Sequence, residues 1–118
     1  MTKEQFQAQK DEVASNHQGS DVEELEYTLP SGEKKKFIAL RPTLELYEKF
    51  LSETMDETKR IRAMKNLTLA CVKFPVRADL NSFLAKFPAA VLSLAGSLLK
   101  AAGATGEAEL NPETEDTE

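Results

Sequence analysis

The sequence predicts an α+β fold, mainly α, in which one N-terminal β-hairpin precedes three or four packed helices. Three observations support this prediction. Residues 22–29 alternate apolar and polar side chains, and a Pro-Ser-Gly turn and a second strand-like run over residues 34–40 follow them, which is typical of a hairpin. Residues 43–102 carry apolar side chains at helical spacing between proline and glycine breakers. Both ends, 1–20 and 104–118, are polar or acidic, so we expect a single domain over residues 21–103 with a tail on either side.

The first twenty residues consist mostly of Gln, Asn, Ser and charged side chains. They predict a polar tail, with a fraying helix over residues 2–13 as the more ordered alternative. The stretch lacks the apolar run of a secretory signal peptide. We therefore expect a soluble, cytoplasmic protein.

The hairpin is predicted from period-two alternation over residues 22–29 and a returning strand over residues 34–40. Proline presets φ and glycine tolerates positive φ, so the segment between the strands, Pro30-Ser31-Gly32-Glu33, has the chemistry of a turn. Acidic side chains of one strand are expected to face basic ones of the other, and each such pair contributes about 0.2–1 kcal/mol. The residues expected to pair are Glu24 and Glu26 with Lys34 and Lys36.

Two amphipathic helices are predicted next, over residues 43–55 and 57–72. Pro42 suits a first helical position, and Asp56 or Thr58 suits the N-cap of the second helix. The second helix should end before Pro75, because a residue that precedes proline is pushed out of the helical region. Its apolar side consists of Ile61, Met64, Leu67, Thr68, Cys71 and Val72. Its other side carries a predicted basic surface made of Lys59, Arg62 and Lys73, beside Asn66.

The last two predicted helices cover residues 80–86 and 88–102. Asp79 is expected to cap the shorter one. Pro88 is expected to start the longer one, and Gly103 to end it. The apolar face of the shorter helix consists of Leu80, Phe83, Leu84 and Phe87.

Residues 87–103 are the most informative stretch, because they contain a single charged residue, Lys100. A helix that buries only one face normally carries charged residues on the other. Here one face is broadly apolar and the other consists of small residues, so this helix is either the central core helix or the contact site of a partner. We hypothesise that whichever residues escape the core contact a client or a second copy. The candidates are Leu92, Leu94, Leu98 and Leu99 on the apolar side, and Ala89, Ser93, Gly96 and Ser97 on the small side.

No set of residues in the chain supports catalysis, cofactor binding or a metal site. The one histidine, His17, lies in the polar tail, and the one cysteine, Cys71, lies on an apolar helix face. Zinc sites and nucleophile–base pairs need several such groups together. We therefore expect a non-enzymatic protein without a cofactor, in which Cys71 packs as a small buried side chain. The apolar stretch is shorter than the ~20 residues that span a bilayer, so no membrane span is expected. It also lacks the Lys/Arg-rich polar face and the tryptophan of an in-plane anchor, so no contact with a membrane surface is expected.

Charge is distributed unevenly along the chain. Residues 33–103 hold 13 basic and 7 acidic side chains, whereas residues 104–118 hold six acidic side chains and no basic one. The basic body leaves a small nucleic-acid-binding regulator as an alternative function. A pI of about 5.0 and the lack of aromatic residues among the basic ones argue against nucleic acid. The acidic segment is expected to be a disordered tail that aids solubility, or one that folds back over the basic body.

The order of these elements resembles the tail assembly chaperones of long-tailed bacteriophages. The resemblance covers residues 22–103 and is carried by Leu29-Pro30-Ser31-Gly32, a strand that ends at Leu40-Arg41, a helix begun by proline or threonine, and the segment FPAAVLSLAGSLLKAAG. In that family a small strand-and-helix domain precedes a variable, often charged C-terminus.

The resemblance implies a non-enzymatic function in the host cytoplasm. Such proteins bind the tape measure protein, a long helical polypeptide, and keep it soluble until the tail tube polymerises around it. They are absent from the finished virion, and the family implies no catalytic residues. We expect self-association, since several copies would extend the contact along such a client. A structural tail or head-completion component that stays in the virion is a further alternative.

Overall fold

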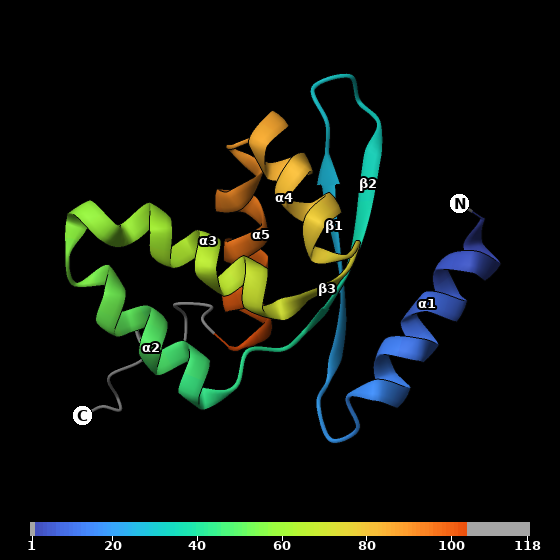
Figure 1. Cartoon of the computed structure of the whole chain (residues 1–118), viewed down its shortest axis with the longest axis horizontal. Coiled ribbons are helices and arrows are strands. Elements are labelled where there is room, and N and C mark those ends of the chain that lie inside the picture. Colours follow the sequence, from blue (N-terminus) through green and yellow to red (C-terminus); the bar gives the residue numbers. More distant parts are fainter. Residues whose placement is uncertain (1, 104–118) are drawn as a thin grey trace, which may run out of the picture.

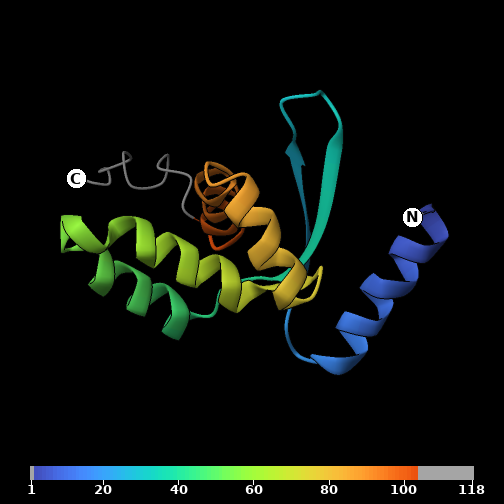
Figure 2. The same ribbon diagram turned by 45° about the horizontal axis from the view of Figure 1, so that its top comes forward.

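The chain forms a three-stranded antiparallel sheet with helices on both faces, and the computed structural model describes residues 2–103 (Figure 1). The sheet order is β1 (Val22–Thr28), β2 (Lys34–Leu40) and β3 (Val72–Phe74). Figures 1 and 2 both place α3, α4 and α5 on one side of the hairpin and α1 on the other. The predicted class, α+β and mainly helical with an N-terminal hairpin, is confirmed.

The hairpin has the predicted strands and turn. Leu25 lies opposite Phe37, and both side chains are buried on the face that carries most of the core. Gly32 has φ +94°, a conformation that glycine adopts without strain, and its N–H donates to the carbonyl of Leu29 at 2.8 Å. The turn therefore sets the register as its residue types predict.

One detail of the cross-strand pairing is different from the prediction. Glu26 lies opposite Lys36 and forms an ion pair with Lys34 at 3.8 Å. Glu24 lies opposite Ile38, and its carboxylate binds the ammonium group of Lys10 at 2.6 Å. The ion-pair partner of Glu24, Lys10, belongs to helix α1. The sequence predicted a shorter helix there, and only as the alternative to a polar tail.

The prediction of a polar N-terminal tail is wrong, because residues 3–16 form helix α1 (Lys3–Asn16). Thr2 and Gln5 form a capping box that satisfies donors at the start of the helix. On the second face of the sheet, Val13 is buried, and Phe6 makes an edge-to-face contact with Phe74 at 6.2 Å between ring centroids. The helical alternative over residues 2–13 was therefore closer to the structure, although the helix extends further.

The next two helices are α2 (Leu44–Thr54) and α3 (Arg60–Cys71), joined through the short 3-10 turn η1 (Glu57–Lys59). Thr43 caps α2, so Pro42 precedes the helix rather than occupying its first position. Asp56 caps η1 by accepting from the N–H of Thr58, and α3 begins three residues later than predicted.

Residues 72–74 were expected to end a helix or follow it, but they form strand β3. Val72 lies opposite Ala39, and Phe74 lies opposite Ile38. The branched side chain of Val72 suits a strand, and the extended conformation required before Pro75 favours the same geometry. The sheet thus gains a third strand.

Helices α4 (Arg77–Lys86) and α5 (Ala90–Ala101) complete the fold. The N-cap of α4 is Val76, without a side-chain hydrogen bond, and Asp79 lies within the first turn rather than at the cap. Gly103 has φ +99°, and its N–H donates to the carbonyl of Lys100 at 2.9 Å, as expected of a terminating glycine.

The core lies between the hairpin and the helices of one face. Phe83 of α4 contacts Phe37 and Tyr27 at ring-centroid distances of 5.3 and 6.0 Å. Helix α5 packs against both α3 and β1, so it is the central helix of this core. The largest fully buried side chains are Phe37, Ile38, Leu80, Leu94, Leu98, Thr68 and Cys71.

Candidate partner-binding surfaces

Helix α5 divides the predicted partner-binding residues into two groups. Leu94 and Leu98 are 1% and 0% exposed and belong to the core, so the expectation that they contact a partner is corrected. Leu99 is half-buried and packs against the same core. These side chains are covered because α5 lies between α3 and β1.

The remaining candidates on α5 are open to solvent to different degrees. Leu92 is 52% exposed, Ala89 and Ser93 are exposed, and Gly96 and Ser97 are half-buried. A Cβ atom added at Gly96 would meet no atom within 4 Å in the part of the chain that the structure describes. The hairpin therefore does not cover this side, which we call the outer face of α5 (Ala89, Leu92, Ser93 and Gly96).

Helix α2 carries an exposed apolar surface that the sequence analysis did not single out. Leu44, Leu51 and Met55 are 71%, 45% and 87% exposed, and we call them the α2 stripe. Their spacing of seven and four residues places them on one helix face. Phe50 and Leu46 occupy another face and line the contact with α3. The signal was present in the sequence: the apolar residues fill about half the helix circumference, more than the roughly 100° that one packing face needs.

The predicted basic surface is not a single stripe. Lys59 ends η1 and Arg62 lies in the first turn of α3, and both are exposed. Lys73 is half-buried and belongs to β3, because the helix ends at Cys71. The three residues therefore belong to different elements and do not form the continuous helix face that the sequence predicted.

Lysines are instead gathered around a hollow between the N-terminal part of α1 and β2. This hollow, the α1–β2 groove, has a volume of about 520 Å³. The ammonium nitrogen of Lys36 lies 5.6 Å from the ring centroid of Phe6, within reach of a cation–π contact. Sequence reasoning missed the groove because it expected a tail where α1 forms one wall. The lining residues are Thr2, Lys3, Phe6, Glu33, Lys34, Lys35, Lys36 and Phe74.

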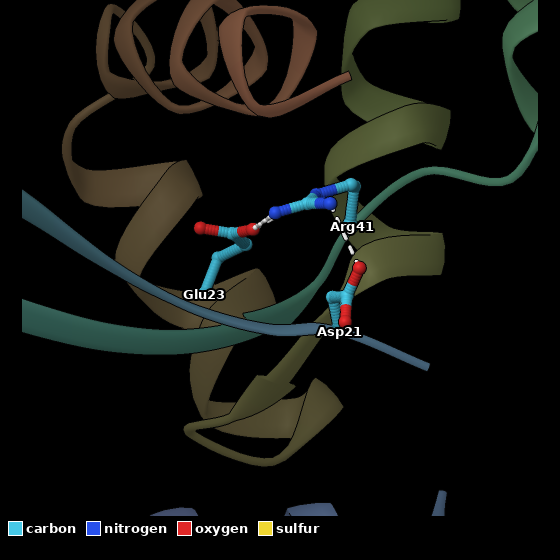
Figure 3. Close-up of polar contacts among 3 residues, drawn as sticks. All are labelled: Asp21, Glu23 and Arg41. Carbon is cyan, nitrogen blue, oxygen red and sulfur yellow. Dashed lines mark hydrogen bonds and ion pairs between the residues drawn. The ribbon is translucent and has the colours of Figure 1, made fainter. Parts of the chain in front are cut away.

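A cluster of three charged side chains joins the start of β1 to the end of β2 (Figure 3). The guanidinium group of Arg41 donates to Glu23 at 2.7 and 3.0 Å and to Asp21 at 2.7 Å. The hydrogen bond with Glu23 and the charge of Asp21 raise the pKa of Arg41. The backbone N–H of Arg41 also donates to the carbonyl of Asp21 at 2.8 Å, so the cluster fastens the start of β1 to the end of β2.

His17 and Cys71, whose side chains could support metal binding or catalysis, belong to different elements. His17 is the C-cap of α1, and Cys71 is buried in α3 as predicted. Burial raises the pKa of the Cys71 thiol to about 11, so the group is protonated at neutral pH and is a poor nucleophile. Within residues 2–103, no three His, Cys, Asp or Glu side chains gather into a potential metal site. No helix in that range is long and apolar enough to cross a membrane.

Comparison with known proteins gives a family and a solved fold. The family described as a domain of unknown function (DUF6848) matches residues 21–111. No curated protein matches the chain. Among solved structures, the chain is similar to an uncharacterised protein from Bacillus stearothermophilus, with 26% sequence identity and a TM-score of 0.67. That match covers 80% of this chain and 92% of the other.

Proposed function

Since the chain belongs to a family of domains of unknown function (DUF6848), we infer its function from its surfaces and propose that it binds a long helical polypeptide without catalysing a reaction. The observation that carries this proposal is the α2 stripe. It exposes three large apolar side chains on a helix whose other face is already packed against α3. Clustered apolar exposure of this kind is typical of interaction sites.

The geometry of the α2 stripe fits an amphipathic helix as the partner. Residues spaced by seven and four positions form a ridge along α2, and a second helix can pack its own apolar stripe beside it. Met55 has an unbranched, flexible side chain, which adapts to varied partner surfaces. Glu45 and Glu48 are exposed on the same helix, so a client with basic residues beside its apolar stripe is favoured.

In this proposal the client is the tape measure protein of a long-tailed phage, and the chain is a tail assembly chaperone of the host cytoplasm. The support is the resemblance in element order over residues 22–103, together with the exposed α2 stripe. We further propose that copies associate through the outer face of α5. Several copies would then cover a long client by many weak contacts, which can later be released.

The test is coexpression of the full chain with a phage tape measure protein in bacteria. We expect the chain to raise the soluble fraction of the client, measured by centrifugation, and to copurify with it. The double substitution Leu51→Glu and Met55→Glu should abolish both effects, because it places two charges in the apolar contact. Circular dichroism is the measurement that checks whether the variant is folded.

A matched control is available on α4. Asn81 and Ala85 are exposed and have the same four-residue spacing, so Asn81→Glu with Ala85→Glu adds the same two charges elsewhere. This control should keep the client soluble. The proposal fails if the wild-type chain does not raise client solubility, or if the folded α2 variant works as well as the control. Recovery of the chain from purified virions would favour a structural component instead.

A further inference from the structure

One half of β2 has an open edge within the described part of the chain. β1 pairs with β2 from Lys34 to Leu40, whereas β3 pairs with it only at Ile38 and Ala39. The chain leaves this edge at Pro75, which has no N–H to continue the ladder, and enters α4. Alternate backbone N–H and C=O groups of residues 34–37 therefore point away from β1 without a strand to receive them.

The α1–β2 groove lies along this same edge. Lys34, Lys35 and Lys36 line it together with Phe74, the last residue of β3. Thr2, Lys3 and Phe6 of the α1 region form the opposite side. The space beyond the edge of β2 is thus a hollow of about 520 Å³, next to backbone groups that can bind an extended chain.

The positive charge of the groove favours an acidic occupant over a second copy of the same edge. Four lysines and one glutamate line it, and Lys34 alone of the four forms an ion pair within residues 2–103, with Glu26 at 3.8 Å. A second copy of this edge would place the same lysines opposite each other, which is unfavourable. An acidic strand would place carboxylates opposite them instead.

We propose that the open edge of β2 binds an extended acidic segment of another protein by β-strand addition. Backbone hydrogen bonds to residues 34–37 hold the segment in the α1–β2 groove. Lys34 and Lys36 project on the α1 face, as the contact of Lys36 with Phe6 shows, and they pair with carboxylates at alternate positions of the segment. The intervening positions lie on the face of Lys35, whose ammonium group lies 5.6 Å from the ring centroid of Phe83. This site is independent of the α2 stripe.

The test uses the full chain and a fluorescent peptide of eight residues that alternates Glu and Val. Fluorescence anisotropy at low salt should show binding. Lys34→Glu with Lys36→Glu should weaken it by about tenfold or more, because two attractive cross-strand pairs become repulsive. Lys34→Gln with Lys36→Gln provides a milder variant if the first does not fold. The matched control Lys65→Glu with Lys100→Glu changes exposed lysines on α3 and α5 and should change affinity by less than about twofold.

A second peptide separates strand addition from simple charge attraction. N-methylation of all eight residues keeps the charges but removes every backbone donor, and it should abolish binding. Equal binding of the methylated peptide would overturn the proposal. So would tighter, lysine-dependent binding of a thymidine oligonucleotide, which would assign the groove to nucleic acid. A variant in which the six acidic residues of segment 104–118 are changed to their amides gives a further test. If the peptide binds this variant but not the wild-type chain, the chain's own segment is the occupant of the groove, and the proposal is overturned.

Discussion

Leu98 and Leu92 lie six residues apart in α5 but have opposite environments. Leu98 is fully buried in the core, whereas Leu92 is half exposed on the outer face. Both residues are leucine, and what distinguishes them is where α3 and β1 pack around the helix. We therefore expect substitutions at these two positions to differ sharply in their effect on stability.

Leu98→Ala is expected to lower the free energy of unfolding by about 2–5 kcal/mol, because it leaves a cavity in the core. Leu92→Ala is expected to change it by less than about 0.5 kcal/mol. Urea unfolding followed by circular dichroism measures both. Equal losses for the two variants would contradict the assignment of the core face of α5.

Cys71 makes stability depend on pH in the alkaline range. Burial raises the pKa of its thiol from 9.0 to about 11, so the folded state favours the protonated form. This contribution to stability is fully present below pH 9 and is lost as the pH rises towards 11. Two pKa units correspond to about 2–3 kcal/mol.

The expected measurement is the free energy of unfolding of wild type and Cys71→Ala between pH 8 and about 11. Other groups titrate in both proteins, so the difference between the two isolates the thiol. Wild type should lose more stability than the variant over this range. Parallel curves would show that Cys71 is accessible to water in the folded state.

At the scale of elements, α1 buries one side chain, Val13, whereas α3 and α5 bury four and five. It is attached to the sheet through Val13, through Phe6 against Phe74, and through the ion pair of Lys10 with Glu24. A helix held by so few buried groups should open locally more readily than α3 or α5.

Val13→Ala is expected to speed amide hydrogen exchange in residues 3–16 by about tenfold or more, because it removes two methyl groups from the buried side chain that anchors α1. Exchange in α3 and α5 should stay unchanged. Ala14→Gln, at the adjacent exposed position, is the control and should leave exchange in α1 nearly as in wild type. A uniform increase across all helices would mean that α1 unfolds only with the whole domain.

The elements also differ in how well their sequence predicts them. The hairpin is marked by its own alternation and by Gly32 in the turn, so its bounds are correct. Helix α1 carries little apolar periodicity, and it is stabilised by a sheet face formed from distant residues. Strand β3 has three residues, too few to show a period, and its pairing with Ile38 and Ala39 is a tertiary contact.

At the scale of the whole molecule, the candidate surfaces belong to different elements. The α2 stripe is apolar, the α1–β2 groove is basic, and the outer face of α5 consists of small side chains beside Leu92. The proposed self-association depends on the last of these. Small residues allow two helices to approach closely, and Leu92 supplies apolar area.

We expect the wild-type chain to sediment as an oligomer at micromolar concentration, and Leu92→Glu to shift it towards the monomer. The reason is that a charge would be buried against the second copy. Sedimentation velocity measures the change, and Asn81→Glu on α4 is the control with the same kind of added charge. A monomeric wild type would contradict self-association through α5.

The sequence by itself determined the fold class, the hairpin with its turn, the presence of four helices between residues 44 and 101 and the burial of Cys71. These features follow from local periodicity and from proline and glycine, which act within a few residues. Only the tertiary structure decided which leucines of α5 are core, that α1 covers the second face of the sheet, and that four lysines share a groove. Those outcomes depend on contacts between segments far apart in the chain, and no local pattern specifies which neighbour will cover a given face.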